Sequence, residues 1–317
     1  MGEGKLTKDG DVLTPSITAN AMGKGIYKSK QKQLDENIKA HNGINIRYDQ
    51  NLAMEMGDWY EEYIIRFACE RIGLTNIVTE FGKKFEHPFY PVECSLDGMA
   101  DAKDLTIVQD EAKGIYCPDG EAVTINNTGI IECKHTNAYP DYKQETLDWR
   151  GWIQLKTQVE CVNTSWGLLI IFYHAVNELH YHFYERDMSF SDELKELAED
   201  WQQRVRTANY FDPETSDDAW IKYNEAIPEE VAELDPKAID ILAQIENLDE
   251  NIKLMGKQKD QLQAQIMDMM GNAEQAVVGD YHVNWGMINY KAQPEKIVPA
   301  KEAYSVRRKS IRIKQVG

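Results

Sequence analysis

Two charged side chains end a stretch of this sequence that otherwise has the pattern of a buried strand. The apolar pair at positions 130–131 is followed directly by Glu132-Cys133-Lys134. Successive side chains of a strand point to opposite faces, so Glu132 and Lys134 project together while Cys133 points the other way, into a core. Charges at the end of a buried strand are costly unless they are paired or used. The pattern therefore predicts a sheet that carries a polar site at one strand end.

A second acidic residue precedes this strand. Asp97 lies in the segment CSLDGMAD, and Asp101 follows it four residues later. Two neighbouring carboxylates attract a hard cation, and a lysine beside them can position or deprotonate a water. Asp97, Glu132 and Lys134 are the residue types that metal-dependent phosphodiester cleavage needs. The alternative is a solvated cross-strand ion pair, which is common for E-x-K on a strand.

Charge and cysteine content limit the class of protein. The 317 residues carry a formal net charge of −18, so a DNA enzyme of this composition has to concentrate its lysines and arginines locally. The five cysteines form no C-x-x-C pair, which argues against a zinc site or an iron–sulfur cluster. There is no apolar secretory segment and no apolar run long enough for a membrane span. We expect a cytoplasmic protein without membrane association.

The N-terminal part predicts a helix with a carboxylate near its buried face. Apolar residues recur at three- and four-residue steps over residues 50–72, and this spacing predicts that Leu52, Met56, Trp59, Tyr63 and Phe67 face the core. Glu61 lies on the flank of that stripe, and Gly73 is expected to end the helix. Before it, Ser16 is expected to cap a helix, or to hold a phosphate together with nearby lysines.

Residues 77–134 have the pattern of strands. Strands interrupted at Pro88 and Pro91 are expected first, followed by an extra hairpin that turns at Pro118-Asp119-Gly120. A second amphipathic helix is predicted over residues 143–163, with Gln154 and Gln158 one turn apart on its polar side. Such a pair is usually solvated, but directly after an E-x-K strand it can line the site.

The C-terminal third predicts helices. Residues 189–230 are acidic, with Trp201 and Trp220 as anchors. Asp235-Pro236 then supplies a cap and a first-turn proline for a long helix that ends at Gly271. Its apolar residues alternate in steps of four and three, interrupted at Lys259, which indicates a coiled-coil-like seam. A small β element follows, and the basic tail RRKSIRIK is either a solvated terminus or a contact to the DNA backbone.

These motifs, in this order, resemble the phage-lambda-type exonucleases, the YqaJ-like viral recombinase family of PD-(D/E)XK nucleases. LTPSITANAM is similar to the family's N-terminal serine segment, and MGDWYEEY to its glutamate-bearing first core helix. CSLDGM is similar to its aspartate motif, IIECKH to its E-x-K strand, and IQLKTQVE to its glutamine helix. A departure is the residue before Asp97, which is Leu96 in place of the usual proline. Asp101 competes with Asp97 through a G-x-x-D pattern.

The resemblance implies an α/β fold, with a PD-(D/E)XK core in which helices flank a central mixed sheet, and a helical C-terminal extension. We expect the core at 1–190, an acidic helical cover at 191–234, and the long helix with the β element at 235–317. The implied catalytic residues are Glu61, Asp97, Glu132 and Lys134. The first three of these would hold Mg²⁺, or Mn²⁺, together with the carbonyl of Cys133. The implied substrate-binding residues are Ser16 and Gln154.

The same resemblance implies a substrate and partners. It indicates an enzyme that degrades double-stranded DNA from its ends in the 5′→3′ direction and leaves 3′ single strands for a single-strand annealing protein. It also implies a homo-oligomer, often a ring-shaped trimer. Two other functions stay open from the sequence. One is an endonuclease on the same core, and the other is a non-catalytic DNA mimic or scaffold in which the long helix is the functional part.

Overall fold

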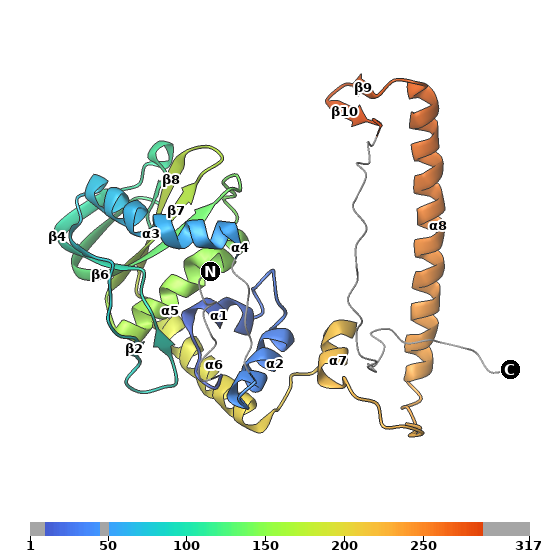
Figure 1. Ribbon diagram of the computed structural model, residues 1–317, viewed down its shortest axis with the longest axis horizontal. Helices are drawn as coiled ribbons and strands as arrows, with labels where there is room; N and C mark the ends of the chain where they lie inside the picture. Colours follow the sequence, from blue (N-terminus) through green and yellow to red (C-terminus); the bar gives the residue numbers. More distant parts are fainter. Residues whose placement is uncertain (1–9, 45–50, 288–317) are drawn as a thin grey trace, which may run out of the picture. The chain divides into compact units, whose positions relative to one another are not determined.

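The computed structural model describes residues 10–44 and 51–287, and the predicted basic tail lies outside them. The chain forms two compact units, Met1–Tyr223 and Asn224–Gly317. Figure 1 shows a sheet flanked by helices in the first unit and a long helix in the second. Among the described helices, none combines the length and apolarity that crossing a membrane requires.

A mixed six-stranded sheet forms the centre of the first unit. Its strand order is β1-β4-β6-β7-β8-β5, and β6 and β7 run parallel in the middle, as do β8 and β5 at one edge. The remaining neighbours are antiparallel. This arrangement confirms the predicted α/β fold class. The strands are β1 (Thr75–Val78), β4 (Gly98–Val108), β5 (Ile115–Tyr116), β6 (Ala122–Thr136), β7 (Trp166–Tyr173) and β8 (Glu178–Glu185).

Helices cover both faces of this sheet. One face packs against α5 (Ile153–Val162) and α6 (Met188–Thr207), whose Trp201 is fully buried. The other face packs against α3 (Leu52–Arg71). Alternate β6 residues belong to these two cores, Ile130 to the α5 side and Ile131 to the α3 side. The remaining helical elements are α1 (Pro15–Ala21), α2 (Lys30–His41), η1 (Glu111–Lys113), α4 (Gln144–Leu147), η2 (Asp148–Trp152) and α7 (Ser216–Lys222).

The predicted inward face of α3 is wrong. Leu52, Met56, Trp59, Tyr63 and Phe67 are all exposed. The buried face of α3 is a second apolar stripe of smaller residues, namely Ile65, Ala68 and Cys69. Small side chains let the helix axis approach the sheet closely, which the aromatic face does not permit. Periodicity identified the helix correctly but selected the wrong one of its two apolar stripes.

Two local predictions also need correction. The cap of α1 is Thr14, and Ser16 lies inside the first turn, exposed, with its hydroxyl 3.3 Å from that of Thr14. The chain does turn at Pro118-Asp119, where the Gly120 N–H donates to the Cys117 carbonyl over 3.1 Å. The predicted hairpin does form, since residues 105–108 pair with 122–125 in antiparallel fashion, but its arms are extensions of β4 and β6 and not separate strands.

The connection between β4 and β6 instead reaches the opposite edge of the sheet. Its short strand β5 pairs in parallel with β8. The segment broken by Pro88 and Pro91 forms a separate two-stranded ribbon. Its strands are β2 (Phe85–Glu86) and β3 (Glu93–Cys94).

The second unit contains one long helix and a β-hairpin. Helix α8 (Ala238–Met270) begins after Lys237, slightly later than the predicted start at Asp235-Pro236, and it ends at Gly271 as expected. The Asp235 carboxylate accepts a hydrogen bond from the Lys237 N–H over 2.9 Å. The hairpin consists of β9 (Gln275–Val278) and β10 (Tyr281–Asn284), joined through Gly279 at φ +56°.

Candidate active site

The site forms where β6 continues beyond its pairing with β4. The β4–β6 ladder includes Gly98 opposite Ile131, and the following β6 residues pair only with β7. Glu132 and Lys134 point toward the α5 side, where the Lys134 ammonium donates to a Glu132 carboxylate oxygen. Cys133 belongs to the core on the α3 side, as the alternation predicted.

Asp97 is held against β6 by the backbone. It lies immediately before β4, and its Oδ2 accepts a hydrogen bond from the Cys133 N–H over 3.1 Å. Gly98 makes this approach possible, because a Cβ there would lie only 3.2 Å from the Ile131 Cβ and 3.3 Å from the Ile65 Cγ2. The ladder between β4 and β6 thus brings together two acids that are far apart in sequence.

The Glu132 carboxyl group is fully buried. Burial and the nearby Asp97 raise its pKa to about 8, although Lys134 and Gln158 act in the opposite direction. A group of this kind is costly to ionise unless another positive charge approaches it. A cation bound beside Glu132 would therefore stabilise the ionised carboxylate.

Lys134 remains charged in this environment. Burial by itself would lower the pKa of the Lys134 ammonium, but the charges of Glu132 and Asp97 outweigh that effect and raise the pKa. Gly151 in η2 packs against the aliphatic part of the Lys134 side chain, and its φ is +124°. A Cβ at Gly151 would lie 3.1 Å from the Lys134 Cε and 2.9 Å from the Leu169 Cδ1, so only glycine fits there without displacing them.

The glutamine that reaches the site is Gln158. Its Nε2 donates to the Glu132 Oε2 over 2.7 Å and lies 3.3 Å from the Ser95 carbonyl oxygen. Gln158 is fully buried, whereas Gln154 one turn earlier is half-buried. The sequence marked both residues as a polar pair but selected Gln154 as the substrate contact. Gln158 was predicted only as a member of a pair that can line the site, and Gly151 was not predicted at all.

Glu61 approaches β6 from the α3 side. It lies half-buried one turn before Ile65, on the face that α3 turns to the sheet. Burial raises the pKa of the Cys133 thiol, and the carboxylates of Asp97, Glu61 and Glu132 add to that rise. Its neighbour Glu62 forms an exposed ion pair with Arg66, with 2.8 Å between Oε1 and Nε.

The competing acid Asp101 is engaged elsewhere. Its carboxylate accepts hydrogen bonds from the Thr128 hydroxyl and from the Asn76 side-chain amide, the latter over 2.8 Å. These bonds lower the pKa of Asp101. Asp101 thus joins β1, β4 and β6 to one another, while Asp97 is the acid that lies beside Glu132.

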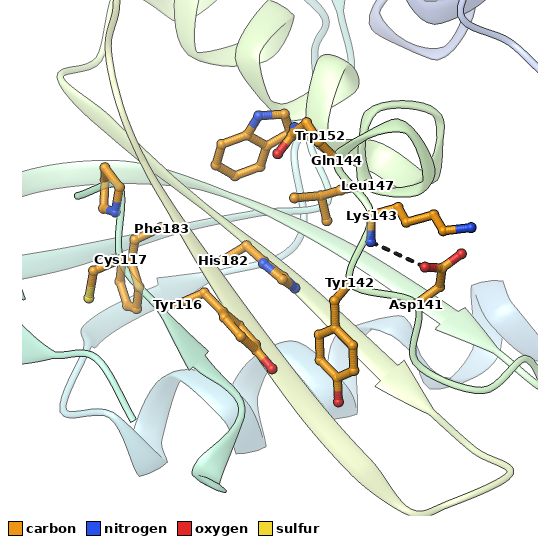
Figure 2. A pocket seen from close by; sticks show the side chains of 11 residues that line it. Tyr116, Cys117, Asp141, Tyr142, Lys143, Gln144, Leu147, Trp152, His182 and Phe183 are labelled. Carbon is orange, nitrogen blue, oxygen red and sulfur yellow. Dashed lines mark hydrogen bonds between the residues drawn. The ribbon is translucent and has the colours of Figure 1, made fainter. Parts of the chain in front are cut away.

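An aromatic cavity of about 250 Å³ lies on the same face of the sheet. Figure 2 shows Tyr116, Tyr142, Trp152 and His182 around it, and the Lys143 N–H donating to Asp141 over 3.1 Å. The strand register places Leu169 between Glu132 and His182, so the cavity begins two strands from the site.

One of the residues that line this cavity is a stacked histidine, His182. Tyr116 stacks on His182 with ring centroids 4.6 Å apart and planes tilted by 8°. Burial, with a smaller contribution from His180, lowers the pKa of His182 to about 3. His180 and His182 are therefore part of an aromatic wall, and stacked rings of this kind are surfaces on which nucleobases can also stack.

The donor atoms at the site are oxygens, the type of ligand that a hard divalent cation prefers. They are carboxylate oxygens of Asp97 and Glu132 and the backbone carbonyl of Cys133, and oxygen is the donor that Mg²⁺ prefers. Within residues 10–44 and 51–287, no three His, Cys, Asp or Glu side chains converge as a group that could hold a metal. A cation at this site would accordingly depend on two side chains, a carbonyl and water.

Comparison with known proteins finds similarity only among solved structures. No family model and no curated protein matches the chain. The alkaline exonuclease LHK-Exo from Laribacter hongkongensis is 17% identical, with a TM-score of 0.44 over 63% of this chain and 90% of that one. LHK-Exo in complex with dAMP gives a TM-score of 0.45 over 62% and 89%, again at 17% identity.

A phage related exonuclease from Haemophilus somnus is 12% identical, with a TM-score of 0.44 over 64% of this chain and 96% of that chain. All three structures are described as exonucleases, and each is distant from this chain in both sequence and TM-score. The similarity is too distant to assign an activity, which has to be inferred from the side chains of the site.

Proposed function

We propose that this chain is a metal-dependent deoxyribonuclease that degrades double-stranded DNA from its ends. The observation that carries the proposal is the fully buried Glu132, which lies beside Asp97 and is paired with Lys134 at a strand end. A structural ion pair has no need of a second acid that raises the pKa of the first. A hydrolytic site does need this combination, because carboxylates hold the cation and the lysine orients water.

In this proposal Asp97, Glu132 and the Cys133 carbonyl hold Mg²⁺, or Mn²⁺, and Glu61 helps to hold a second ion or its waters. The bound cation would supply charge stabilisation for the phosphorane-like transition state and for the leaving 3′ oxygen. Lys134 orients the attacking water through its ammonium. Gln158 fixes the Glu132 carboxylate, and the aromatic cavity offers a stacking surface for an unpaired base.

The resemblance of the sequence motifs to the phage-lambda-type exonucleases supports the finer parts of the proposal. It favours 5′→3′ polarity, with Ser16 and Gln154 contacting the substrate and 3′ single strands passed to an annealing protein. It also favours a homo-oligomer such as a ring trimer. The net charge of −18 requires that DNA is engaged locally, at the site, rather than by the general surface.

Digestion of end-labelled linear duplex DNA tests the proposal, with a covalently closed circle as control. We expect Mg²⁺-dependent loss of the 5′ label while the circle stays intact. Cutting of the circle would make the protein an endonuclease on the same core. No cleavage with Mg²⁺ or Mn²⁺ would favour a non-catalytic DNA mimic or scaffold.

A pair of aspartate variants tests which acid serves the site. Asp97→Asn removes a charge beside Glu132, so we expect at least a 100-fold loss of cleavage, the scale seen when one electrostatic contact to a transition state is lost. Asp101→Asn, on the same strand region, should keep activity within a few-fold because Asp101 bonds to Thr128 and Asn76. The reverse outcome would assign the site to Asp101.

A further inference from the structure

Helix α8 carries an apolar seam that the described residues of its own unit, 224–287, leave largely uncovered. The helix runs without interruption through 33 residues, a length of about 50 Å. Ile252 and Leu262 are more than half exposed, at 67% and 61%. The seam positions are Ile241, Ile245, Leu248, Ile252, Met255, Lys259, Leu262, Ile266 and Met269. They follow one another in strictly alternating steps of four and three.

We propose that α8 forms a parallel, two-stranded coiled coil with α8 of a second copy of this chain. In heptad notation the a positions are Ile245, Ile252, Lys259 and Ile266. The d positions are Ile241, Leu248, Met255, Leu262 and Met269. Three of the four a positions are isoleucine, and two of the five d positions are leucine. Isoleucine at a with leucine at d favours two parallel strands, because the side chains at the two positions enter their holes at different angles.

The single polar seam residue supports the same number of strands. Lys259 occupies an a position, and one polar a residue fixes register and oligomer state at some cost in stability. In a parallel pair, the two Lys259 side chains can extend outward along their stems toward the edge of the interface. There each ammonium can donate to the carbonyl oxygen of the partner subunit's Gln258, which flanks the seam at position g.

The charge pattern permits two identical helices to meet. Every charged residue of α8 except Asp249 and Lys259 lies at the outer positions b, c and f. The flanking e and g positions are otherwise uncharged, with Gln244, Asn251, Gln258, Gln263 and Gln265 among them. Like charges therefore do not face each other along the edges, as they would if these positions carried one sign of charge.

The area available is sufficient for a stable dimer. Burial of one Leu, Ile or Met side chain removes roughly 60–120 Å² of apolar surface from water. The eight apolar seam residues of one helix would then bury roughly 500–1,000 Å². A standard stable interface buries about 800 Å² per partner, so the seam alone approaches this size.

The mass of the full-length protein in solution tests the proposal, with one variant in the seam and one outside it. Ile252→Asp places a charge at an a position and should halve the mass measured by light scattering. Leu254→Asp is the matched control, because Leu254 is exposed in the same turn but lies at outer position c. Both residues are exposed, so neither change should disturb folding, and circular dichroism can verify this.

The halving is expected even if the first unit associates separately, since only the contact through α8 is removed. Equal masses for wild type and Ile252→Asp would overturn the proposal. So would halving by both variants, because the contact would then not follow the heptad seam. DNA cleavage per protomer is measured in parallel, and its loss or retention does not bear on this result.

Strand direction is tested by cysteine cross-linking. The five native cysteines are buried, so the wild-type protein supplies a low background. Ile241→Cys brings two thiols together at the N-terminal end of a parallel pair, and we expect most of the protein to migrate as a covalent dimer after mild oxidation. An antiparallel pair would instead place position 241 opposite position 266. Cross-linking that requires both Ile241→Cys and Ile266→Cys would therefore overturn the parallel arrangement.

Discussion

In the first unit a carboxyl group is fully buried, whereas in the second unit a row of apolar side chains is left exposed. Glu132 lies inside the sheet beside Asp97, and Ile252 and Leu262 lie on the open face of α8. Each arrangement reverses the usual distribution of polar and apolar groups. Each is also favourable if a partner is added, a cation with DNA in the first case and a second helix in the second. Unfavourable burial and unfavourable exposure thus identify two different kinds of binding surface.

The first unit would have no cation site if Glu132 and Lys134 formed only a structural ion pair. Lys134→Ala should lower DNA cleavage by about 1,000-fold or more, because it removes the group that orients the water in the proposed site. Lys113→Ala is the control, since the exposed Lys113 pairs with Asp110 over 2.7 Å outside the proposed site. Retained cleavage in the Lys134 variant, with a normal circular dichroism spectrum, would contradict the assignment.

The pH dependence of stability tests whether the buried Glu132 is protonated in the folded protein. The pKa of Glu132 is about 8 in the folded protein, against an ordinary value of 4.5. Between these values the folded state holds a proton that the unfolded state has lost, so the free energy of unfolding should fall as pH rises through this window. The effect of this one group reaches at most a few kcal/mol, at about 1.4 kcal/mol for each unit of pKa difference.

Chemical denaturation in the presence of a chelator measures this slope. Glu132→Gln keeps the shape of the side chain but cannot ionise, and it should flatten the dependence between about pH 5 and pH 8. The variant should accordingly gain most, relative to wild type, at the upper end of this range. An unchanged slope would show that Glu132 is ionised in the folded protein across the whole range.

The smallest expected effect is a difference in stability between alanine variants of the two glutamines of α5. Gln158→Ala leaves a Glu132 oxygen and the Ser95 carbonyl without their shared donor, which should lower the free energy of unfolding by about 1–3 kcal/mol. Gln154→Ala, one turn away and half-buried, should change it by less than about 0.5 kcal/mol. Urea denaturation compares the two. If Gln154 contacts the substrate as proposed, its variant should instead raise the KM for DNA.

Local periodicity was enough to predict much of the fold and which side chains share a face at the proposed site. Alternation along β6 placed Glu132 and Lys134 on one face and Cys133 on the other, because side-chain direction in a strand depends only on position. The heptad steps likewise predicted the seam of α8. These features depend on residues that are close in sequence.

Long-range packing decided the rest. The sequence of α3 offers two apolar stripes, and only contact with the sheet selected the one with Ile65, Ala68 and Cys69. Gln158 and Asp97 reach the site because α5 and β4 dock on β6 in a particular register, and the same register assigns Asp101 to Thr128. Periodicity states which residues share a face, but it does not state which face is covered, since the covering element comes from elsewhere in the chain.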